Sequence, residues 1–478
     1  MTTTAGSYNN PTVVVLPPGA SLGSDDQDVR IYYVNTDDDA SFSLNTPSGN
    51  FSAKATQLGA EMHKRGHSTL SAAKAQYAVH LDEKPADGSH FLNMKHGGKH
   101  WVFNDPGAVA DYTLVRNVMA FHTQRDMNQW APRTKFFELF IAQDSSLPLD
   151  PSNPDTYYNA VLAKVEADPQ TYYDGVYINM EKIRKESHRI DIPEYTPTTP
   201  NVGAAIIQLN PGSSKYDPLN QFNPLPLTAD VQIYEPKAKY FTANPTQLGP
   251  LQLWYNDQNN KSGWGYNMFL IFTNTGTTTT WDDIRTSTDY PSFATYFLMN
   301  ELAKDPDGYH KSTFMYKTAD TPASGQTPAV PGKMNAGPLW DKNKSYGNVI
   351  LQYSQDYSSP DGWLYSISGQ APLWWGVLLQ DKQFCQEVWS QWTQNTATGG
   401  ALTDTVINAY IAKKVADLDT SGALTGNNTR WQNSYNMTMS DYNAQVTDLT
   451  TYITNRLTWM GSKLQGLLNS TSGFTPAS

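Results

Sequence analysis

Two aspartates in the second half of the chain, Asp307 and Asp341, have the residue type and the surroundings of a phosphoryl-transfer site. Asp307 lies in NELAKDPDGYHKSTFMYK, residues 300–317, and Asp341 lies in MNAGPLWDKNKSYGN, residues 334–348. Phosphoryl transfer requires one carboxylate that orients the attacking hydroxyl and another that holds magnesium against the phosphates. The sequence therefore suggests Asp307 as a catalytic residue and Asp341 as a metal ligand.

Two further oxygen donors follow these aspartates closely. Ser312 comes five residues after Asp307, the spacing at which protein kinases place an asparagine that binds a second metal ion. Asn343 comes two residues after Asp341, and its amide oxygen can supplement the Ser312 hydroxyl, a weaker ligand for a hard cation. A plainer interpretation stays open, because Asp-Gly pairs such as Asp307-Gly308 are common in turns.

Hydrophobic periodicity predicts helices on both sides of these residues. Residues 292–304 have the spacing of a helix that ends just before Asp307. Residues 195–265 are rich in Pro, Asn and Gly and contain the strand-like runs VGAAIIQLN and LQLWYN, so we interpret them as a connecting or inserted region. A last long helix is predicted from a core-packing stripe at steps of three and four residues, formed by Val446, Leu449, Ile453, Leu457, Met460, Leu464 and Leu467.

The first half of the chain has the pattern of an α+β region. The predicted helix at residues 111–127 would be capped by Asp111 or Thr113. Glu181 shares one face of the last predicted strand with Tyr177 and Asn179, and we expect it to point away from the packed face, toward a cleft or solvent. The predicted strands are at residues 12–16, 29–34, 74–81, 133–142 and 175–183.

The composition is that of a folded protein with a large core. Hydrophobic residues make up 39% and aromatic residues 12% of the 478 residues. The net charge of -11 disfavours general binding to nucleic acid or anionic membranes. The single cysteine, Cys385, excludes an internal disulfide, and its apolar context predicts a buried thiol. No apolar run reaches the length of a transmembrane helix, and no signal peptide is visible.

In several motifs, which occur along the chain in the family's order, the sequence resembles the CotH family. Members of this family are kinase-like proteins first known from bacterial spore coats. The tail from WWGVLLQDKQFCQEVWSQW to YITNRLTWM also resembles the closing helices of that family. The motifs are RGHSTLSAAKAQYAVHL at 65–81, DYTLVRNVMAFHTQRDM at 111–127, APRTKFFELFI at 131–141, YDGVYINMEKIRKESHRIDI at 173–192, and the segments around Asp307 and Asp341.

The resemblance implies an α+β, two-lobed atypical protein-kinase-like fold. A mixed, β-rich amino-terminal lobe and a mainly helical carboxyl-terminal lobe are expected. The expected segments are a lead-in at 1–25, the amino-terminal lobe at 26–194 with an insertion at 143–172, the connecting or inserted region at 195–289, and the carboxyl-terminal lobe with the metal site at 290–478.

The resemblance also implies an ATP- and Mg²⁺-dependent protein Ser/Thr kinase that acts on basic coat or surface proteins, with its own hydroxyls among the acceptors. It favours a location in the spore coat, at the cell surface or outside the cell. Lys74 would pair with phosphate, and Glu181 would orient Lys74 or contact the nucleotide near the hinge between the lobes. Lys182, beside Glu181 at the end of the strand that leads to this hinge, is a further candidate for nucleotide binding. Arg116 would bind phosphate or a carboxylate. The plainer interpretations are a surface lysine for Lys74 and a structural anchor for Arg116.

Two other classes of function stay open. Many members of the family carry Asn at the position of Ser312 and Asp at that of Asn343, so a catalytically weak or inactive pseudokinase-like binding module is the first alternative. A carbohydrate- or envelope-binding protein with exposed aromatics is the second, although the helical spacing of Trp374, Trp375, Trp389 and Trp392 favours a core role. His90, His96 and His100 suggest either a zinc or phosphate site or a plain glycine-containing loop.

Overall fold

In the computed structural model, the chain forms two compact units from interleaved segments. The first unit contains Met1–Val118, Pro132–Lys182 and Ala409–Thr447, and the second contains the remaining residues. The residues that the structure describes are 7–34, 41–43, 51–66, 69–85, 90–94, 98–109, 111–195, 203–209, 221–222, 231–255, 263–273, 279–321, 324, 330–348, 356–369, 371–420 and 422–476.

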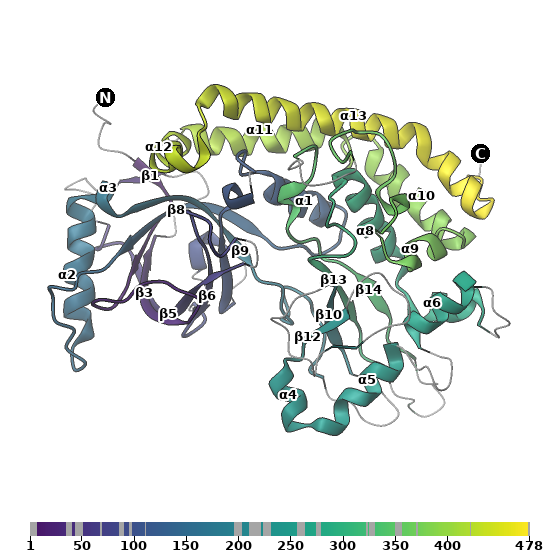
Figure 1. Cartoon of the computed structure of the whole chain (residues 1–478), viewed down its shortest axis with the longest axis horizontal. Coiled ribbons are helices and arrows are strands. Elements are labelled where there is room, and N and C mark those ends of the chain that lie inside the picture. Colours follow the sequence, from purple (N-terminus) through teal and green to yellow (C-terminus); the bar gives the residue numbers. More distant parts are fainter. Residues whose placement is uncertain are drawn as a thin grey trace. The chain divides into compact units, whose positions relative to one another are not determined.

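Seven strands of the first unit close into a barrel in the order β2, β3, β5, β6, β7, β9, β8 (Figure 1). The barrel closes where β2 pairs with β8 in parallel, and this closure removes free sheet edges. Side chains such as Val14, Ile31, Trp101 and Phe137 fill its interior. The strands are β2 (Pro11–Val15), β3 (Gln27–Tyr33), β5 (Thr56–Arg65), β6 (Gln76–Leu81), β7 (His100–Asn104), β8 (Thr134–Ala142) and β9 (Tyr173–Glu181), and a separate pair joins β1 (Ser7–Asn9) to β4 (Ser41–Ser43).

The expected insertion at 143–172 forms two helices, α2 (Pro154–Ala167) and α3 (Pro169–Tyr172). Val161 and Leu162 of α2 pack against Val13 of β2 in a second apolar cluster, outside the barrel. Figure 1 shows α2 running beside the strands. The insertion therefore covers the outer face of β2 and β8, which explains why that face is apolar.

Helix α12 (Ala423–Tyr435) packs against β9 within the first unit. Gly175 has a φ of 109°, and a side chain there would lie 2.6 Å from Asn427 Oδ1 and 3.0 Å from Trp431 Nε1. The missing side chain lets α12 approach the backbone of β9. Trp431 Nε1 then donates a hydrogen bond of 2.8 Å to the carbonyl oxygen of Asp174.

A five-stranded sheet in the order β11, β12, β10, β13, β14 lies in the second unit. Its central strand β10 pairs antiparallel with β12 and β13, although β10 and β12 come from the stretch expected to be a connecting region. Ile233 of β12 and Phe241 of α4 share a small apolar cluster. The strands are β10 (Ala205–Leu209), β11 (Gln221–Phe222), β12 (Val231–Glu235), β13 (Thr313–Lys317) and β14 (Met334–Ala336).

The remaining helices include the two that were predicted around the site. The predicted helix at 292–304 is α8, and the predicted last helix is α13, whose stripe residues Leu449, Ile453 and Met460 are buried as expected. The helices are α1 (Arg116–Asp126), α4 (Ala238–Ala243), α5 (Leu248–Tyr255), α6 (Trp264–Thr273), α7 (Trp281–Ser287), α8 (Tyr290–Ala303), α9 (Leu373–Leu378), α10 (Lys382–Thr396), α11 (Asp404–Thr420) and α13 (Met439–Ser472).

The mixed α+β class is confirmed, with a β-rich amino-terminal region and a helical carboxyl-terminal region. The closed barrel is not a clear match to the two-lobed kinase-like fold that the resemblance implied. The strand-like interpretation of LQLWYN is wrong, because the run lies in α5. Leu251 and Tyr255, four residues apart, are both buried while Leu253 between them is 50% exposed, and a strand would place all three on one face.

The expected orientation of Glu181 is also wrong. Tyr177 belongs to the apolar cluster inside the barrel, so the face that it shares with Asn179 and Glu181 is the inner face. Glu181 itself is 1% exposed. Alternation could not identify the inner face, because Val176, Ile178 and Met180 on the other face are buried as well.

Candidate functional site

The loop that carries Asp307 starts at the end of helix α8. The helix ends at Ala303, and the capping residue Lys304 adopts the left-handed backbone conformation with a φ of 45°. The Lys304 ammonium group is fixed by backbone carbonyl oxygens, at 3.1 Å from Asp356 and 2.9 Å from Ser359, and also by that of Asp361. Asp305 therefore follows the helix at a well-defined point.

Asp305 joins the loop of Asp307 to the loop of Asp341. Its Oδ1 accepts the backbone N–H of Asp307 at 3.0 Å, and its Oδ2 accepts a hydrogen bond of 2.9 Å from Lys342 Nζ. Both partners of this ion pair are buried. Burial lowers the pKa of Lys342, but the charge of Asp305 and the contact with Tyr296 outweigh it, so that the pKa is raised and the ammonium keeps its charge.

Ser312 and Asp341 are in direct contact. Ser312 Oγ donates a hydrogen bond of 2.9 Å to Asp341 Oδ2. Both residues are in the left-handed region, with φ values of 49° and 52°, and Tyr346 nearby in sequence has a φ of 52°. Such conformations cost about 1–3 kcal/mol each in non-glycine residues and cluster at functional sites. The backbone thus supports the interpretation that these two loops form a site.

The carboxylate of Asp307 lies between two lysines. Lys311 Nζ is 3.3 Å from its Oδ1, and Lys344 Nζ is 4.0 Å from its Oδ2. The side chain of Asp307 is 23% exposed, so solvent reaches it. The plain interpretation of Asp307 as a turn residue and the functional one are both compatible with its place in the turn after α8.

Two glutamines near the end of α1 hold the strand that leads to Asp341. Gln124 Oε1 accepts the N–H of Leu339 at 2.9 Å, and Gln129 Nε2 donates to the carbonyl oxygen of Ala336 at 2.5 Å. Gln124 Nε2 also donates a hydrogen bond of 2.7 Å to Gln129 Oε1. The backbone on the amino-terminal side of Asp341 is therefore anchored by side chains.

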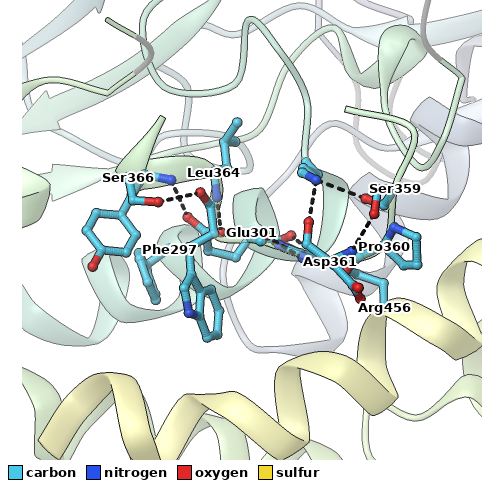
Figure 2. A network of polar contacts seen from close by, with 12 residues as sticks. Phe297, Glu301, Ser359, Pro360, Asp361, Leu364, Ser366 and Arg456 are labelled. Carbon is cyan, nitrogen blue, oxygen red and sulfur yellow. Dashed lines mark hydrogen bonds and ion pairs between the residues drawn. The ribbon is translucent and has the colours of Figure 1, made fainter. Parts of the chain in front are cut away.

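A buried ion pair joins Glu301 of α8 to Arg456 of α13 (Figure 2). Arg456 Nε donates to the Glu301 carbonyl oxygen, and its Nη1 donates to the carbonyls of Pro360 and Gly362. Tyr309, which follows Asp307 in the loop, donates its hydroxyl to Glu301 Oε1 at 3.0 Å. Burial raises the pKa of Glu301, and the surrounding donors counter part of that effect.

The two loops carry oxygen donors of the kind that Mg²⁺ prefers. Mg²⁺ is usually bound by one or two carboxylates, with phosphate and water oxygens completing its shell. Asp307, Asp341, Ser312 and Asn343 supply oxygen donors on two loops that Asp305 joins. Within the described ranges, no cluster of three or more His, Cys, Asp and Glu side chains could hold a metal. An ion held by these donors would take the rest of its shell from phosphate and water.

Lys74, in the first unit, is fully buried. Its Nζ donates to Asp105 Oδ1 at 3.1 Å, to the Val176 carbonyl oxygen at 2.5 Å and to Asn427 Oδ1 at 3.0 Å. Burial lowers the pKa of Lys74, while Asp105 raises it. The three N–H donors of the ammonium group are therefore all matched by acceptors. The surface interpretation is wrong, and the proposed pairing with Glu181 is not formed, since the carboxylate that Lys74 meets is Asp105.

The other residues that the resemblance singled out lie in the first unit too. Glu181 accepts the backbone N–H of Arg133 at 2.8 Å and pairs with its guanidinium group at 3.1 Å. Arg116 begins α1 and pairs at 2.7 Å with the buried Asp111, the carboxylate contact that was one of its expected roles. Lys182 directly follows β9. Ser312 and Asp341 are thus brought together, whereas Lys74 and Glu181 have separate partners.

Sequence reasoning missed the residues that connect these groups. Asp305 and Lys342 are 37 positions apart, and no short-range pattern links them, although Asp305 lies only two residues before Asp307. Asp105 and Asn427 were missed for the same reason. The signal that was available was charge: Lys342 and Lys344 alternate with Asp341 and Asn343, which a bare metal site does not explain.

The simpler expectations have clear outcomes. Trp374, Trp375 and Trp392 are buried, as predicted for core residues, whereas Trp389 is half-buried. Cys385 is buried, and burial raises the pKa of its thiol. Of the three histidines, His96 lies outside the described residues. In the part of the chain that the structure describes, no helix combines the length and apolar character needed to cross a bilayer.

Comparison with known protein families identifies a family model that the chain matches. A family model described as CotH kinase protein matches residues 62–460, which is most of the chain and includes both site loops and Lys74. No curated protein matches the chain.

Proposed function

The chain belongs to the CotH family, and from this premise we propose that it is a protein-kinase-like phosphotransferase. It transfers the γ-phosphate of ATP to Ser or Thr hydroxyls of a protein, with its own hydroxyls among the acceptors. The observation that carries the proposal is the joining of two loops: Asp305 binds both the backbone of Asp307 and the side chain of Lys342, next to Asp341.

In this proposal Asp307 orients the acceptor hydroxyl and accepts its proton. Its carboxylate is partly exposed and is held at the turn after α8 by the hydrogen bond from its backbone to Asp305. Asp341, Ser312 and Asn343 hold Mg²⁺. When bound, Mg²⁺ neutralises charge on the phosphates and aligns the leaving oxygen. The hydrogen bond from Ser312 fixes the rotamer of Asp341.

The role of Lys74 in nucleotide binding is a separate part of the proposal. Its ammonium already has three acceptors, so contact with a phosphate requires that one of them be exchanged. Asn427 is the neutral side chain among them. Arg116, Glu181 and Lys182 stay proposed nucleotide-binding residues, with Arg116 and Glu181 engaged in ion pairs of their own.

The proposal is tested by incubating the purified full chain with γ-labelled ATP and Mg²⁺, alone and with a basic, Ser-rich protein. We expect label on protein with wild type, and loss of transfer with Asp307→Ala and with Asp341→Ala. Lys463→Met, an exposed lysine of α13, is the matched control that should transfer like wild type. Transfer that survives in both aspartate variants would contradict the proposed roles.

A pseudokinase-like binding module is the second candidate, and the donor set favours it. Ser312 and Asn343 stand where many family members carry Asn and Asp, and no group of three acidic or histidine side chains that could hold a metal is found among the described residues. This candidate predicts ATP binding without label transfer in the same assay. The burial of Trp374, Trp375 and Trp392 favours a core role for these tryptophans over an exposed aromatic platform.

A further inference from the structure

The charged side chains of the two site loops balance one another. Two divalent cations would bring four positive charges into the site, and ions of one sign at short range repel strongly. The side chains of the two loops carry no excess of negative charge to balance two Mg²⁺ ions, so the phosphates of a ligand would have to supply it. The three carboxylates are Asp305, Asp307 and Asp341, and the three ammonium groups are Lys311, Lys342 and Lys344.

The buried ion pair between Lys342 and Asp305 neutralises one positive and one negative charge of the site. Lys342 and Asp305 are 2.9 Å apart, with side chains 2% and 1% exposed, so neither is available to a ligand. The other two carboxylates are Asp307 and Asp341, which accepts the hydrogen bond from Ser312. Lys311 and Lys344 are left as cations, with side chains 44% and 25% exposed.

These two lysines flank the carboxylate of Asp307. They lie at opposite oxygens of Asp307, the residue that would receive the proton of the acceptor hydroxyl. At 4.0 Å from Oδ2, the Lys344 ammonium is too distant for a hydrogen bond to Asp307. Its donors can therefore turn to an anion without breaking a hydrogen bond to that carboxylate. A lysine ammonium binds phosphate as a point charge.

We propose that Lys311 and Lys344 bind the phosphates directly, in place of a second divalent cation, and that the site takes one Mg²⁺. The ligand class is a linear polyphosphate, such as the chain of a nucleoside triphosphate. The inference rests on the proposed phosphoryl-transfer function for its biological meaning, but its test does not require transfer.

The first test is calorimetric titration of the full chain with inorganic tripolyphosphate in buffer with EDTA. We expect wild type to bind, and Lys311→Met and Lys344→Met each to bind about tenfold more weakly or worse, as for loss of a charge-assisted hydrogen bond. Lys463→Met should bind like wild type. Failure of wild type to bind, or binding by both site variants that equals wild type, overturns the proposal.

The second test measures a gain in metal affinity, which a misfolded variant cannot show. Removal of Lys311 takes a positive charge away from Asp307, so Lys311→Met should bind Mn²⁺, as a probe for Mg²⁺, more tightly than wild type. Asp307→Asn should bind Mn²⁺ more weakly and tripolyphosphate more tightly. One Mn²⁺ per chain is expected at saturation, and two per chain overturn the proposal.

The two proposals fail in different ways. Wild type that binds tripolyphosphate through both lysines but never transfers label contradicts the phosphotransferase and leaves the lysine site standing. Label transfer by Lys311→Met and Lys344→Met with the wild-type KM for ATP overturns the lysine site and leaves the phosphotransferase standing.

Discussion

At the scale of single residues, Ser312 is the position where the site departs most clearly from the resemblance. A hydroxyl replaces the amide that many family members carry, and the backbone there has a φ of 49°. Asparagine tolerates this left-handed conformation better than serine does. Neither the geometry nor the hydrogen bond to Asp341 therefore requires a serine.

Ser312→Asn should strengthen the metal site, because an amide oxygen is a better ligand for a hard cation. We expect Mn²⁺ affinity to rise several-fold, and Ser312→Ala to lower it by about tenfold through loss of the hydrogen bond that orients Asp341. Calorimetric titration with Mn²⁺ measures both. Equal affinities for the three proteins would remove Ser312 from the site.

At the scale of elements, a buried ion pair links helices α8 and α13. Glu301 and Arg456 side chains are fully buried, and Arg456 also holds the carbonyls of Pro360 and Gly362. The link fixes the end of α8, from which the Asp307 loop continues. We expect its loss to affect stability more than the loss of any surface charge.

Arg456→Met should lower the free energy of unfolding by about 3–5 kcal/mol, because Glu301 keeps its burial and loses its partner. The pKa of Glu301, already raised, should rise further. A carboxyl whose folded pKa is raised stabilises the protein below its unfolded pKa of about 4.3, and this contribution is lost as pH rises through the folded pKa. The variant should therefore be less impaired at pH 5 than at pH 8.

Urea denaturation followed by tryptophan fluorescence at the two pH values measures this. Lys463→Met on the same helix is the control and should change stability by less than about 0.5 kcal/mol. The double variant Glu301→Gln, Arg456→Met should recover part of the loss. A single variant as stable as wild type at pH 8 would contradict the account of the pair.

Lys74 offers a second test at this scale, since this residue, just before β6, contacts both β9 and α12. Lys74→Met leaves Asp105 buried without its ion-pair partner, so we expect the free energy of unfolding to fall by about 3–5 kcal/mol. The double variant Lys74→Met, Asp105→Asn should recover part of this loss. Urea denaturation measures the loss. ATP binding by the double variant then tests whether Lys74 also binds nucleotide. Wild-type affinity for ATP would show that Lys74 has only a structural role.

The sequence predicted elements better than partners. Strands β2, β3, β8 and β9 and helices α8 and α13 follow from period-two and period-3.6 patterns in runs long enough to show them. The barrel does not follow, because closure depends on β2 pairing with β8 more than a hundred residues away. The inner face of β9 was misassigned because both of its faces are apolar and buried.

The candidate site also combines residues that the sequence could predict with contacts that it could not. Asp307, Asp341 and Ser312 could be proposed from spacing and resemblance, and the structure joins Ser312 to Asp341. The ion pair of Asp305 with Lys342 and the placement of Lys311 and Lys344 about Asp307 depend on how two loops fold onto each other. No local pattern reports such contacts, so these residues could be found only in three dimensions.

At the scale of the whole molecule, the net charge of -11 bears on the choice of protein substrate. Electrostatic attraction brings oppositely charged partners together faster, and salt screens it within a Debye length of about 8 Å at physiological ionic strength. A basic acceptor protein should therefore be favoured at low salt over a neutral one.

We expect the kcat/KM for a basic, Ser-rich acceptor to fall by about tenfold between low salt and roughly 0.5 M salt, while the KM for ATP changes much less. Steady-state kinetics at several salt concentrations measure this. A matched acceptor in which the basic residues are replaced by glutamine is the control and should show little salt dependence. Equal salt dependence for both acceptors would contradict electrostatic selection.

The central claim is that the joined loops of Asp307 and Asp341 perform phosphoryl transfer. The most direct measurement is single-turnover transfer from γ-labelled ATP with saturating Mg²⁺, comparing wild type with Asp307→Asn. The account predicts transfer by wild type and a fall in its rate by about 10²–10⁴-fold in the variant, with ATP binding retained. Transfer at the wild-type rate by Asp307→Asn, or none by wild type with ATP bound, would contradict it.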